Sequence, residues 1–193
     1  MTRTLQEKAA LIRAMLDLTP PAEQPALAVM TGLPGTGKTT FARALAEAGP
    51  FTLVGSDLVR AALFPSPQFA PQENAVVYEV ADAVIWDLLR EGRWVIYDAT
   101  NLSEGRREMV RRVGLNAAAR LVTVRTTAPV AVIKARLAQR AASIPPDGVS
   151  TADWSVYERL RVREQPVAHS YIEVDTTQDI AVAVREVVRR LRG

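Results

Sequence analysis

The stretch Gly32-Leu33-Pro34-Gly35-Thr36-Gly37-Lys38-Thr39 decides the fold of this 193-residue chain. It fits the pattern G-x-x-x-x-G-K-[ST], in which glycines let successive backbone N–H groups face one anion. An apolar run from Ala26 to Thr31 precedes it and a helical pattern begins at Lys38, which is the setting that the pattern requires. The N-terminus of the helix carries a partial positive charge that favours a bound anion. Lys38 can reach the outer phosphates, and the Thr39 hydroxyl can ligate Mg²⁺. The stretch therefore predicts a phosphate-binding loop between a strand and a helix.

Short apolar runs and helical patterns alternate along the rest of the chain. Apolar runs rich in Val and Ile predict buried strands, and the patterns between them predict helices. Strands that alternate with helices form a parallel sheet covered on both faces. The expected strands are 26–31, 51–54, 94–97, 121–125 and 171–174, and the expected helices are 4–18, 38–48, 57–64, 72–90, 103–115, 129–142, 152–165 and 178–191. The sequence therefore predicts an α/β fold in three layers.

The composition excludes several classes of protein. The chain has no cysteine and a single histidine, so a disulfide framework, a thiolate zinc site and a histidine-cluster metal site are excluded. No stretch approaches the roughly 18 uncharged apolar residues of a membrane span. The first residues continue with polar side chains instead of an apolar signal core. We therefore expect a soluble, cytoplasmic protein that has no membrane partner and holds any metal ion through oxygen.

The expected domain organisation is simple. With 48% hydrophobic residues and a net charge of +3, the chain is expected to fold as one domain over 1–193, with an N-terminal helix inside 1–19. The charge is uneven. Residues 1–100 carry 8 Lys and Arg against 11 Asp and Glu, whereas residues 101–193 carry 16 against 10. The second half of the chain is therefore basic.

The residues around the loop limit the class of reaction that the protein is expected to catalyse. A GTPase is expected to carry an Asn-Lys-x-Asp segment for guanine, and the sequence has none. A motor ATPase usually places a Glu after the Asp that ends its second acidic strand, to polarise water, but Asp98 is followed by Ala99. Phosphoryl transfer to an acceptor hydroxyl remains, and this reaction needs a metal ion, positioned charge and a group that takes the hydroxyl proton.

Two carboxylates are expected at the carboxyl ends of strands beside the loop, where sites of parallel sheets lie. Asp57 follows the second strand, and Ser56 before it can cap the next helix while Asp57 faces the site. Asp98 ends the third strand and can hold metal-bound water or orient a basic partner. Two plainer interpretations stay open: Asp57 as a helix cap, and Asp98 as part of a turn with Thr100 and Asn101.

Four stretches resemble P-loop kinases, namely the kinase domain of polynucleotide 5′-hydroxyl kinases and its zeta-toxin-like and chloramphenicol-phosphotransferase-like relatives. The stretches are Gly32-Leu-Pro-Gly-Thr-Gly-Lys-Thr-Thr40, Gly55-Ser-Asp-Leu-Val-Arg60, Val95-Ile-Tyr-Asp-Ala-Thr-Asn-Leu102 and Lys134-Ala-Arg-Leu-Ala-Gln-Arg140. The resemblance covers roughly 26–177 and implies a three-layer P-loop fold with a five-stranded parallel sheet in the order 2-3-1-4-5. It also implies ATP and Mg²⁺ as cofactors and a helical lid, which we place at 136–156.

The resemblance implies a role for each matching residue. Asp57 is the general base on the acceptor hydroxyl, Arg60 touches an acceptor phosphate, and Asp98 braces Arg60. Arg136 and Arg140 of the lid clamp the phosphates of the donor. The catalytic set is then Lys38, Asp57 and Arg140, and Asn101 joins Asp57, Arg60 and Asp98 in the acceptor site. The expected nucleotide-binding residues are Gly35, Thr36, Gly37, Lys38, Thr39, Thr40, Arg136 and Arg140, with Mg²⁺ on Thr39 and, through water, on Asp57 or Asp98.

Plainer interpretations apply to the other polar and aromatic residues near these motifs. Pro129 suits the first turn of the lid helix, whose other end carries Arg136 and Arg140 on one side. His169 is expected at the surface. Trp154 and Tyr157 are expected to pack within the lid, with stacking on an acceptor base as the alternative. A solvated helix face is expected to contain Arg106, Arg107, Arg111 and Arg112, with a nucleic-acid patch as the alternative.

The sequence thus predicts an ATP-dependent kinase that acts on a hydroxyl group. The first choice of acceptor is the 5′-hydroxyl of a nucleic acid, because Arg60 and Asp98 match the motif and the second half is basic. The alternative is a small molecule such as an antibiotic, a sugar or a nucleoside-like alcohol, because residues 64–77 carry no basic side chain that could follow a nucleic-acid backbone. A third possibility is a nucleotide-binding regulator that transfers nothing.

Overall fold

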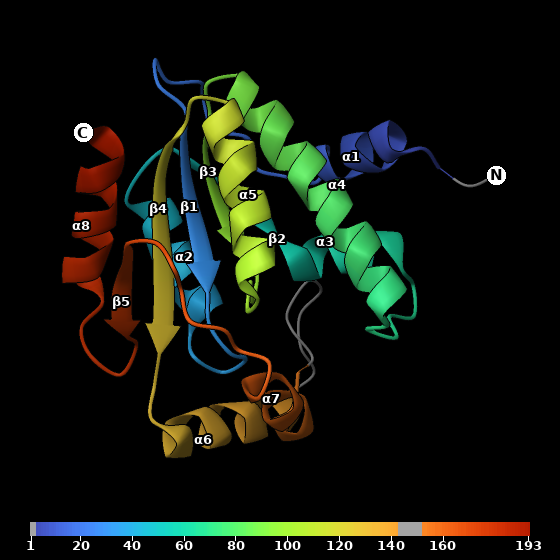
Figure 1. Cartoon of the computed structure of the whole chain (residues 1–193), viewed down its shortest axis with the longest axis vertical. Helices are drawn as coiled ribbons and strands as arrows, with labels where there is room; N and C mark the ends of the chain where they lie inside the picture. Colours follow the sequence, from blue (N-terminus) through green and yellow to red (C-terminus); the bar gives the residue numbers. More distant parts are fainter. Residues whose placement is uncertain (1–2, 143–151) are drawn as a thin grey trace.

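A computed structural model describes residues 3–142 and 152–193 and contains a five-stranded parallel sheet. The strands lie in the order β2-β3-β1-β4-β5, which confirms the predicted fold and strand order (Figure 1). Their bounds are β1 Ala26–Thr31, β2 Phe51–Gly55, β3 Trp94–Asp98, β4 Arg120–Thr127 and β5 Tyr171–Asp175. Because all the strands run the same way, their carboxyl ends meet at one edge of the sheet.

Helices cover both faces of the sheet, as predicted. Side chains that alternate along β1 separate the two faces: Leu27 and Val29 point into one apolar cluster, while Ala28 and Met30 point into the other. The first cluster is covered by α1 (Leu5–Arg13), α3 (Ser56–Leu63), α4 (Pro71–Arg90) and α5 (Glu104–Asn116). The second is covered by α2 (Lys38–Glu47) and α8 (Ala181–Arg192). The three layers leave only the carboxyl edge of the sheet for polar chemistry.

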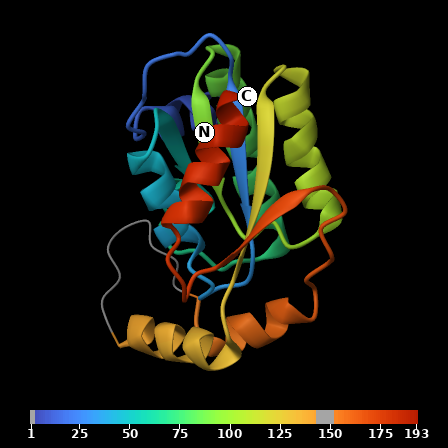
Figure 2. The ribbon, with the colours of Figure 1, turned by 90° about the vertical axis from the view of Figure 1, so that its left-hand side faces the viewer.

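Two helices lie beyond the carboxyl ends of the strands. They are α6 (Val130–Ala141) and α7 (Trp154–Arg161), and Figure 2 shows them below the sheet edge to which the strand arrows point. A small apolar cluster of Leu33, Leu102, Ile133, Leu137 and Tyr157 packs them on the loop after β1. The predicted lid, 136–156, overlaps the second half of α6 and the start of α7, and its residues 143–151 lie outside the described residues.

Several helix bounds differ from the prediction for identifiable reasons. The helix α7 ends at Arg161 instead of 165, because Pro166 disfavours helical backbone before it and the Gln165 amide donates to the Leu102 carbonyl at 3.0 Å. The first helix ends at Arg13 instead of 18. The next residues reach the sheet, where the Thr19 hydroxyl donates to the Pro50 carbonyl at 2.8 Å. Pro129 is the N-cap of α6 and not part of its first turn.

The prediction of a solvated arginine face on α5 is wrong for two of its members. Arg106 is only 9% exposed because it crosses to α4, where its guanidinium forms two 2.6 Å hydrogen bonds with the Asp82 carboxylate. It also donates to the Tyr97 hydroxyl at 3.1 Å and lies over the Tyr78 ring. Arg107 is 5% exposed. Arg111 and Arg112 lie at the surface as predicted, and Glu108 pairs with both.

Within the described residues, no helix combines the length and the apolar character needed to cross a membrane.

Candidate active site

The loop between β1 and α2 has the backbone that its glycines predict. Gly35 and Gly37 have φ angles of 81° and 89°, in the left-handed region that favours glycine. A Cβ on Gly35 would lie 2.9 Å from Ile133 Cγ2 in α6, and one on Gly37 would lie 2.8 Å from Thr176 Oγ1 after β5. Gly37 is also the N-cap of α2, so the backbone N–H groups of the first turn, which have no partner within the helix, lie at the loop. The loop is therefore built to receive an anion.

The Thr36 side chain supports the loop from below. Its hydroxyl is buried and lies 2.8 Å from the Thr126 hydroxyl of β4, and it also donates to the Leu33 carbonyl at 2.8 Å. A nucleotide contact by Thr36, as the sequence predicts, can thus come only from its backbone. Thr40, in the first turn of α2, is exposed.

The Lys38 ammonium is folded back onto the loop, where Nζ donates to the Leu33 carbonyl at 2.9 Å. Burial lowers the pKa of Lys38 to about 8, although the carboxylates of Asp98 and Asp57 act in the opposite direction. The charge of Arg140 also acts on Lys38 and lowers its pKa. The three predicted catalytic residues, Lys38, Asp57 and Arg140, therefore lie within electrostatic reach of one another.

The Asp98 carboxylate lies next to Thr39, where the sequence predicts a magnesium site. The Thr39 hydroxyl donates to Asp98 Oδ2 at 2.6 Å, because β1 and β3 are neighbours in the sheet and end side by side. Hydroxyl and carboxylate oxygens suit Mg²⁺, which usually takes few protein ligands and completes its shell with phosphate and water. No cluster of three or more Asp, Glu or His side chains that could hold a metal occurs in 3–142 or 152–193. Thr39 and Asp98 thus fit a magnesium ion that arrives with a nucleotide.

Asp57 lies in the first turn of α3, at the end of β2, and is partly exposed. Ser56 does not cap this helix as predicted. The helix already includes Ser56, its N-cap is Gly55, and no side chain bonds the cap. Asp57 therefore places its carboxylate at the N-terminus of a helix, where the helix dipole stabilises negative charge.

Arg60 is placed differently from what the resemblance implies. It is 6% exposed, and Nη2 donates to Asn74 Oδ1 at 2.6 Å while Nη1 lies 3.6 Å from the Glu73 carboxylate. The ring of Phe69 covers the guanidinium at 4.7 Å. The side chains that hold Arg60 thus belong to α4 and to the segment before it. The Asp98 carboxylate instead accepts a hydrogen bond from the Thr39 hydroxyl.

Asn101 is also buried, at 1% exposure, and is not open to an acceptor in this structure. Its Nδ2 donates to the Met30 carbonyl at 2.8 Å, and the Thr31 hydroxyl donates to the Asn101 carbonyl at 3.1 Å. Asn101 has a positive φ of 43°, which asparagine tolerates better than most residues. It therefore ties the loop after β3 to the end of β1.

The two predicted lid arginines have different surroundings. Arg136 donates to the Thr176 hydroxyl at 2.8 Å and to the Thr176 carbonyl at 3.0 Å, and it reaches the Gly35 carbonyl at 3.3 Å. Arg140 lies one turn further along α6, and its charge reaches Lys38. As predicted, Trp154 and Tyr157 pack within the lid, with ring centroids 4.7 Å apart and Tyr157 buried.

A family model described as an AAA domain matches residues 27–166. The chain belongs to this family. Membership in this family implies that the protein binds ATP. A comparison with curated proteins finds no match.

The AAA-domain protein is similar to several solved structures with the P-loop kinase fold. One is a candidate kinase from Chloroflexus aurantiacus j-10-fl, at 23% identity and a TM-score of 0.72 over 88% of this chain and 100% of that chain. Another is the Mycobacterium tuberculosis APS kinase CysC in complex with AMPPNP and APS, at 20% identity and a TM-score of 0.65 over 90% and 100%. A third belongs to the Pnkp1/Rnl/Hen1 RNA repair complex, at 23% identity and a TM-score of 0.59 over 74% and 44%. These likenesses establish the P-loop kinase fold of the AAA-domain protein.

The sequence analysis assigned no role at the site to two residues that the structure places near it. Thr176 lies after β5, and its hydroxyl donates to the Thr36 carbonyl at 2.8 Å and accepts from Arg136. Arg107 bridges the loop after β3 and the segment after α7. A short-range pattern could not identify either, because each acts on residues far away in the sequence. Asp82 was detectable, since it is an acid directly flanked by apolar residues on both sides within α4.

Proposed function

We propose that this AAA-domain protein is a kinase that transfers the γ-phosphoryl group of ATP to a hydroxyl group of a small molecule. The observation that carries the proposal is the meeting of Lys38, Thr39, Asp57 and Asp98 at the carboxyl ends of neighbouring strands. Phosphoryl transfer is catalysed mainly by positioning and charge, and these side chains can supply both. The N-terminus of α2 and Lys38 would hold the β- and γ-phosphates, and Thr39 with Asp98 would hold Mg²⁺.

The magnesium ion, when bound, would neutralise charge between the β- and γ-phosphates. Asp57 would accept the proton of the acceptor hydroxyl as the hydroxyl oxygen attacks phosphorus. Arg140 would add positive charge at the transferring phosphate from the side of α6. In these roles the Asp57 carboxylate acts from the N-terminus of α3.

Two observations support a small-molecule acceptor over a nucleic acid. Arg60, the cation expected to meet an acceptor phosphate, already contacts Asn74, Glu73 and the Phe69 ring. Part of the basic excess of the second half also faces inward, because Arg106 and Arg107 are buried and paired. The positive charge left at the surface is therefore smaller than the composition suggests.

A nucleic-acid 5′-hydroxyl remains the second candidate for a specific reason. The exposed side chains of Arg159 and Arg161 lie in the last turn of α7, and exposed Arg163 follows this helix. Such a group could contact a phosphate backbone, which would make binding depend strongly on salt.

The proposal is tested by measuring ATP consumption with a panel of sugars, nucleosides and other small alcohols, alongside DNA and RNA oligonucleotides that carry a 5′-hydroxyl. We expect turnover with a member of the small-molecule panel, and a rate that changes little between 50 and 200 mM salt. A labelled oligonucleotide product with a steep salt dependence would instead establish the second candidate. ATP binding without turnover on any member would support a nucleotide-binding regulator.

Asp57→Asn is predicted to lower turnover by about a hundredfold or more, because the amide keeps the shape of the side chain but cannot accept the proton. The affinity for ATP should change little, since Asp57 contacts the acceptor in this proposal. Turnover and ATP binding are measured on the same preparation. Asp17→Asn, an exposed change outside the site, is the matched control. Loss of ATP binding with normal saturated turnover would assign Asp57 to the metal or to the fold.

Asp98→Asn and Thr39→Ala are each predicted to raise the Mg²⁺ concentration that gives half-maximal turnover, by about tenfold or more. Thr39→Ala removes the hydroxyl, and Asp98→Asn removes the negative charge, of the two groups that lie 2.6 Å apart. A Mg²⁺ titration at saturating ATP measures the effect, with the exposed Asp87→Asn as the control. An unchanged Mg²⁺ requirement in both variants would place the ion elsewhere.

A further inference from the structure

Arg107 forms a saturated set of hydrogen bonds that the proposed chemistry does not use. All five of its N–H groups can be matched with acceptors, and the side chain is 5% exposed. Its Nη1 donates to the Asn101 and Leu102 carbonyls, both at 2.8 Å, and its Nη2 donates to the Gln165 and Pro166 carbonyls at 2.9 and 2.6 Å. Its Nε donates to Glu104 Oε2 at 2.9 Å. One buried guanidinium thus joins two backbone segments that are about 60 residues apart.

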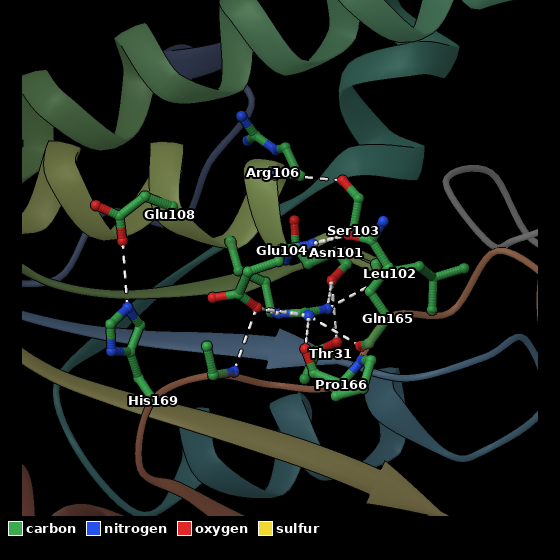
Figure 3. Close-up of polar contacts among 12 residues, drawn as sticks. Thr31, Asn101, Leu102, Ser103, Glu104, Arg106, Glu108, Gln165, Pro166 and His169 are labelled. Atoms are coloured by element: carbon green, nitrogen blue, oxygen red, sulfur yellow. Dashed lines mark hydrogen bonds and ion pairs between the residues drawn. The ribbon is translucent and has the colours of Figure 1, made fainter.

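The first of these segments is the β3–α5 loop, which we define as residues 99–103. It begins directly after Asp98 and is bonded to the end of β1. The Gly32 amide donates to the Thr100 carbonyl at 3.1 Å, and Asn101 Nδ2 donates to the Met30 carbonyl at 2.8 Å. Figure 3 shows Thr31, Asn101 and Leu102 together at this junction. This loop therefore fixes the position of both the phosphate loop and Asp98.

The second segment is the return segment, residues 162–170, which connects α7 to β5. Figure 3 shows Gln165 and Pro166 beside Leu102. The Gln165 side chain accepts from the Glu104 amide at 2.7 Å, and the Gln165 amide donates to the Leu102 carbonyl at 3.0 Å. The return segment thus leads from the helices that carry the lid to the edge strand of the sheet.

Packing contributes little to holding the return segment. Most of its residues are exposed, and Val162 is 77% exposed. A cavity of about 340 Å³ lies between it and the sheet, lined by Val29, Leu121 and Thr123 from the strands, by Arg107, and by Val167 and His169 from the segment. A segment with few buried apolar contacts depends on its hydrogen bonds for its position. Arg107 supplies two of these bonds, to the Gln165 and Pro166 carbonyls.

We propose that Arg107 is a positioning residue that holds the return segment against the β3–α5 loop and thereby places α6 and α7, with Arg136 and Arg140, over the phosphate loop. This role rests on the proposed function, because it assumes that α6 presents its arginines to a bound nucleotide. A small misplacement of charged groups at a reacting centre can cost about a hundredfold in rate.

The test uses the full chain with Arg107→Gln and Arg107→Lys. Arg111→Gln, one turn further along α5 and at the surface, is the matched control. Lysine keeps the charge but has three donors in place of five, so Arg107→Lys should have an intermediate effect. Should Arg107→Gln fail to fold, Arg107→Lys carries the same test.

Hydrogen exchange without nucleotide is the first measurement. We expect amides in 162–168 to exchange at least about tenfold faster in Arg107→Gln than in the wild-type chain, with the core strands unchanged. On addition of AMPPNP, peptides from α6 and α7 should gain protection in the wild-type chain and in Arg111→Gln, but less in Arg107→Gln. Wild-type exchange rates and wild-type protection in both Arg107 variants would overturn the proposal.

Kinetics separate positioning from a general loss of structure. With an acceptor that supports turnover, we expect kcat per AMPPNP-binding site to fall about tenfold or more while KM for ATP changes less than about threefold. Equal kcat per binding site in Arg107→Gln and Arg111→Gln would contradict the proposal. Should no acceptor support turnover in the wild-type chain, the proposed function fails, and hydrogen exchange still decides the role of Arg107.

Discussion

Lys38→Met is expected to lower turnover by about a hundredfold to a thousandfold, which corresponds to about 3 to 4 kcal/mol of transition-state stabilisation. Methionine keeps the length and the buried position of the side chain but removes the ammonium group. That group lies 2.9 Å from the Leu33 carbonyl and has to leave this acceptor for the phosphates of a bound nucleotide. Within the proposed mechanism, Arg140 adds its charge from α6, a role separate from that of Lys38.

The measurement is the initial rate of ATP consumption at saturating acceptor, with melting temperature as a check on folding. Lys8→Met is the matched control, because Lys8 lies in α1 on the opposite part of the molecule from α6 and α7 (Figure 1). Lys8→Met should retain the wild-type rate. If Lys38→Met retains more than about a tenth of the wild-type rate, a loss below about 1.4 kcal/mol, then the loop is not catalytic.

Asp82→Leu is expected to lower the free energy of unfolding by about 3 to 5 kcal/mol, because it leaves the buried guanidinium of Arg106 without its counter-ion. Arg106 forms two 2.6 Å hydrogen bonds with Asp82, and its side chain is 8% exposed. Such a loss is a large part of the stability of an ordinary domain, which is about 5 to 15 kcal/mol. Urea unfolding followed by circular dichroism measures it.

The double variant Asp82→Leu with Arg106→Met is expected to recover most of this loss, since an apolar pair can replace a buried ion pair at little cost. Asp87→Leu, an exposed change on the same helix, should alter stability by less than about 1 kcal/mol. A double variant as unstable as Asp82→Leu alone would show that packing around Asp82, and not its charge, sets the cost.

Local patterns were sufficient for the fold. The loop at 32–39 fixes a strand before it and a helix after it, and the alternation of apolar runs with helical patterns predicts five parallel strands. The order of the strands followed from the family resemblance. Where the ends of α1 and α7 were wrong, a tertiary contact contributed. The amide of Gln165 bonds the Leu102 carbonyl instead of continuing α7, and the chain after α1 turns toward β2.

The sequence also predicted that Lys38, Thr39, Asp57 and Asp98 lie near one another, because carboxyl ends of neighbouring parallel strands meet at one edge. Only the tertiary structure decided what the arginines do. A helical pattern shows which residues share a face, but Arg106 and Arg107 are buried by partners 24 and 58 residues away, Asp82 and Gln165. Arg60 is likewise held by Asn74 and Glu73 of α4 instead of Asp98. A charged side chain takes the partner that packing brings within about 3 Å, and that partner is set by the assembled fold and not by spacing along the chain.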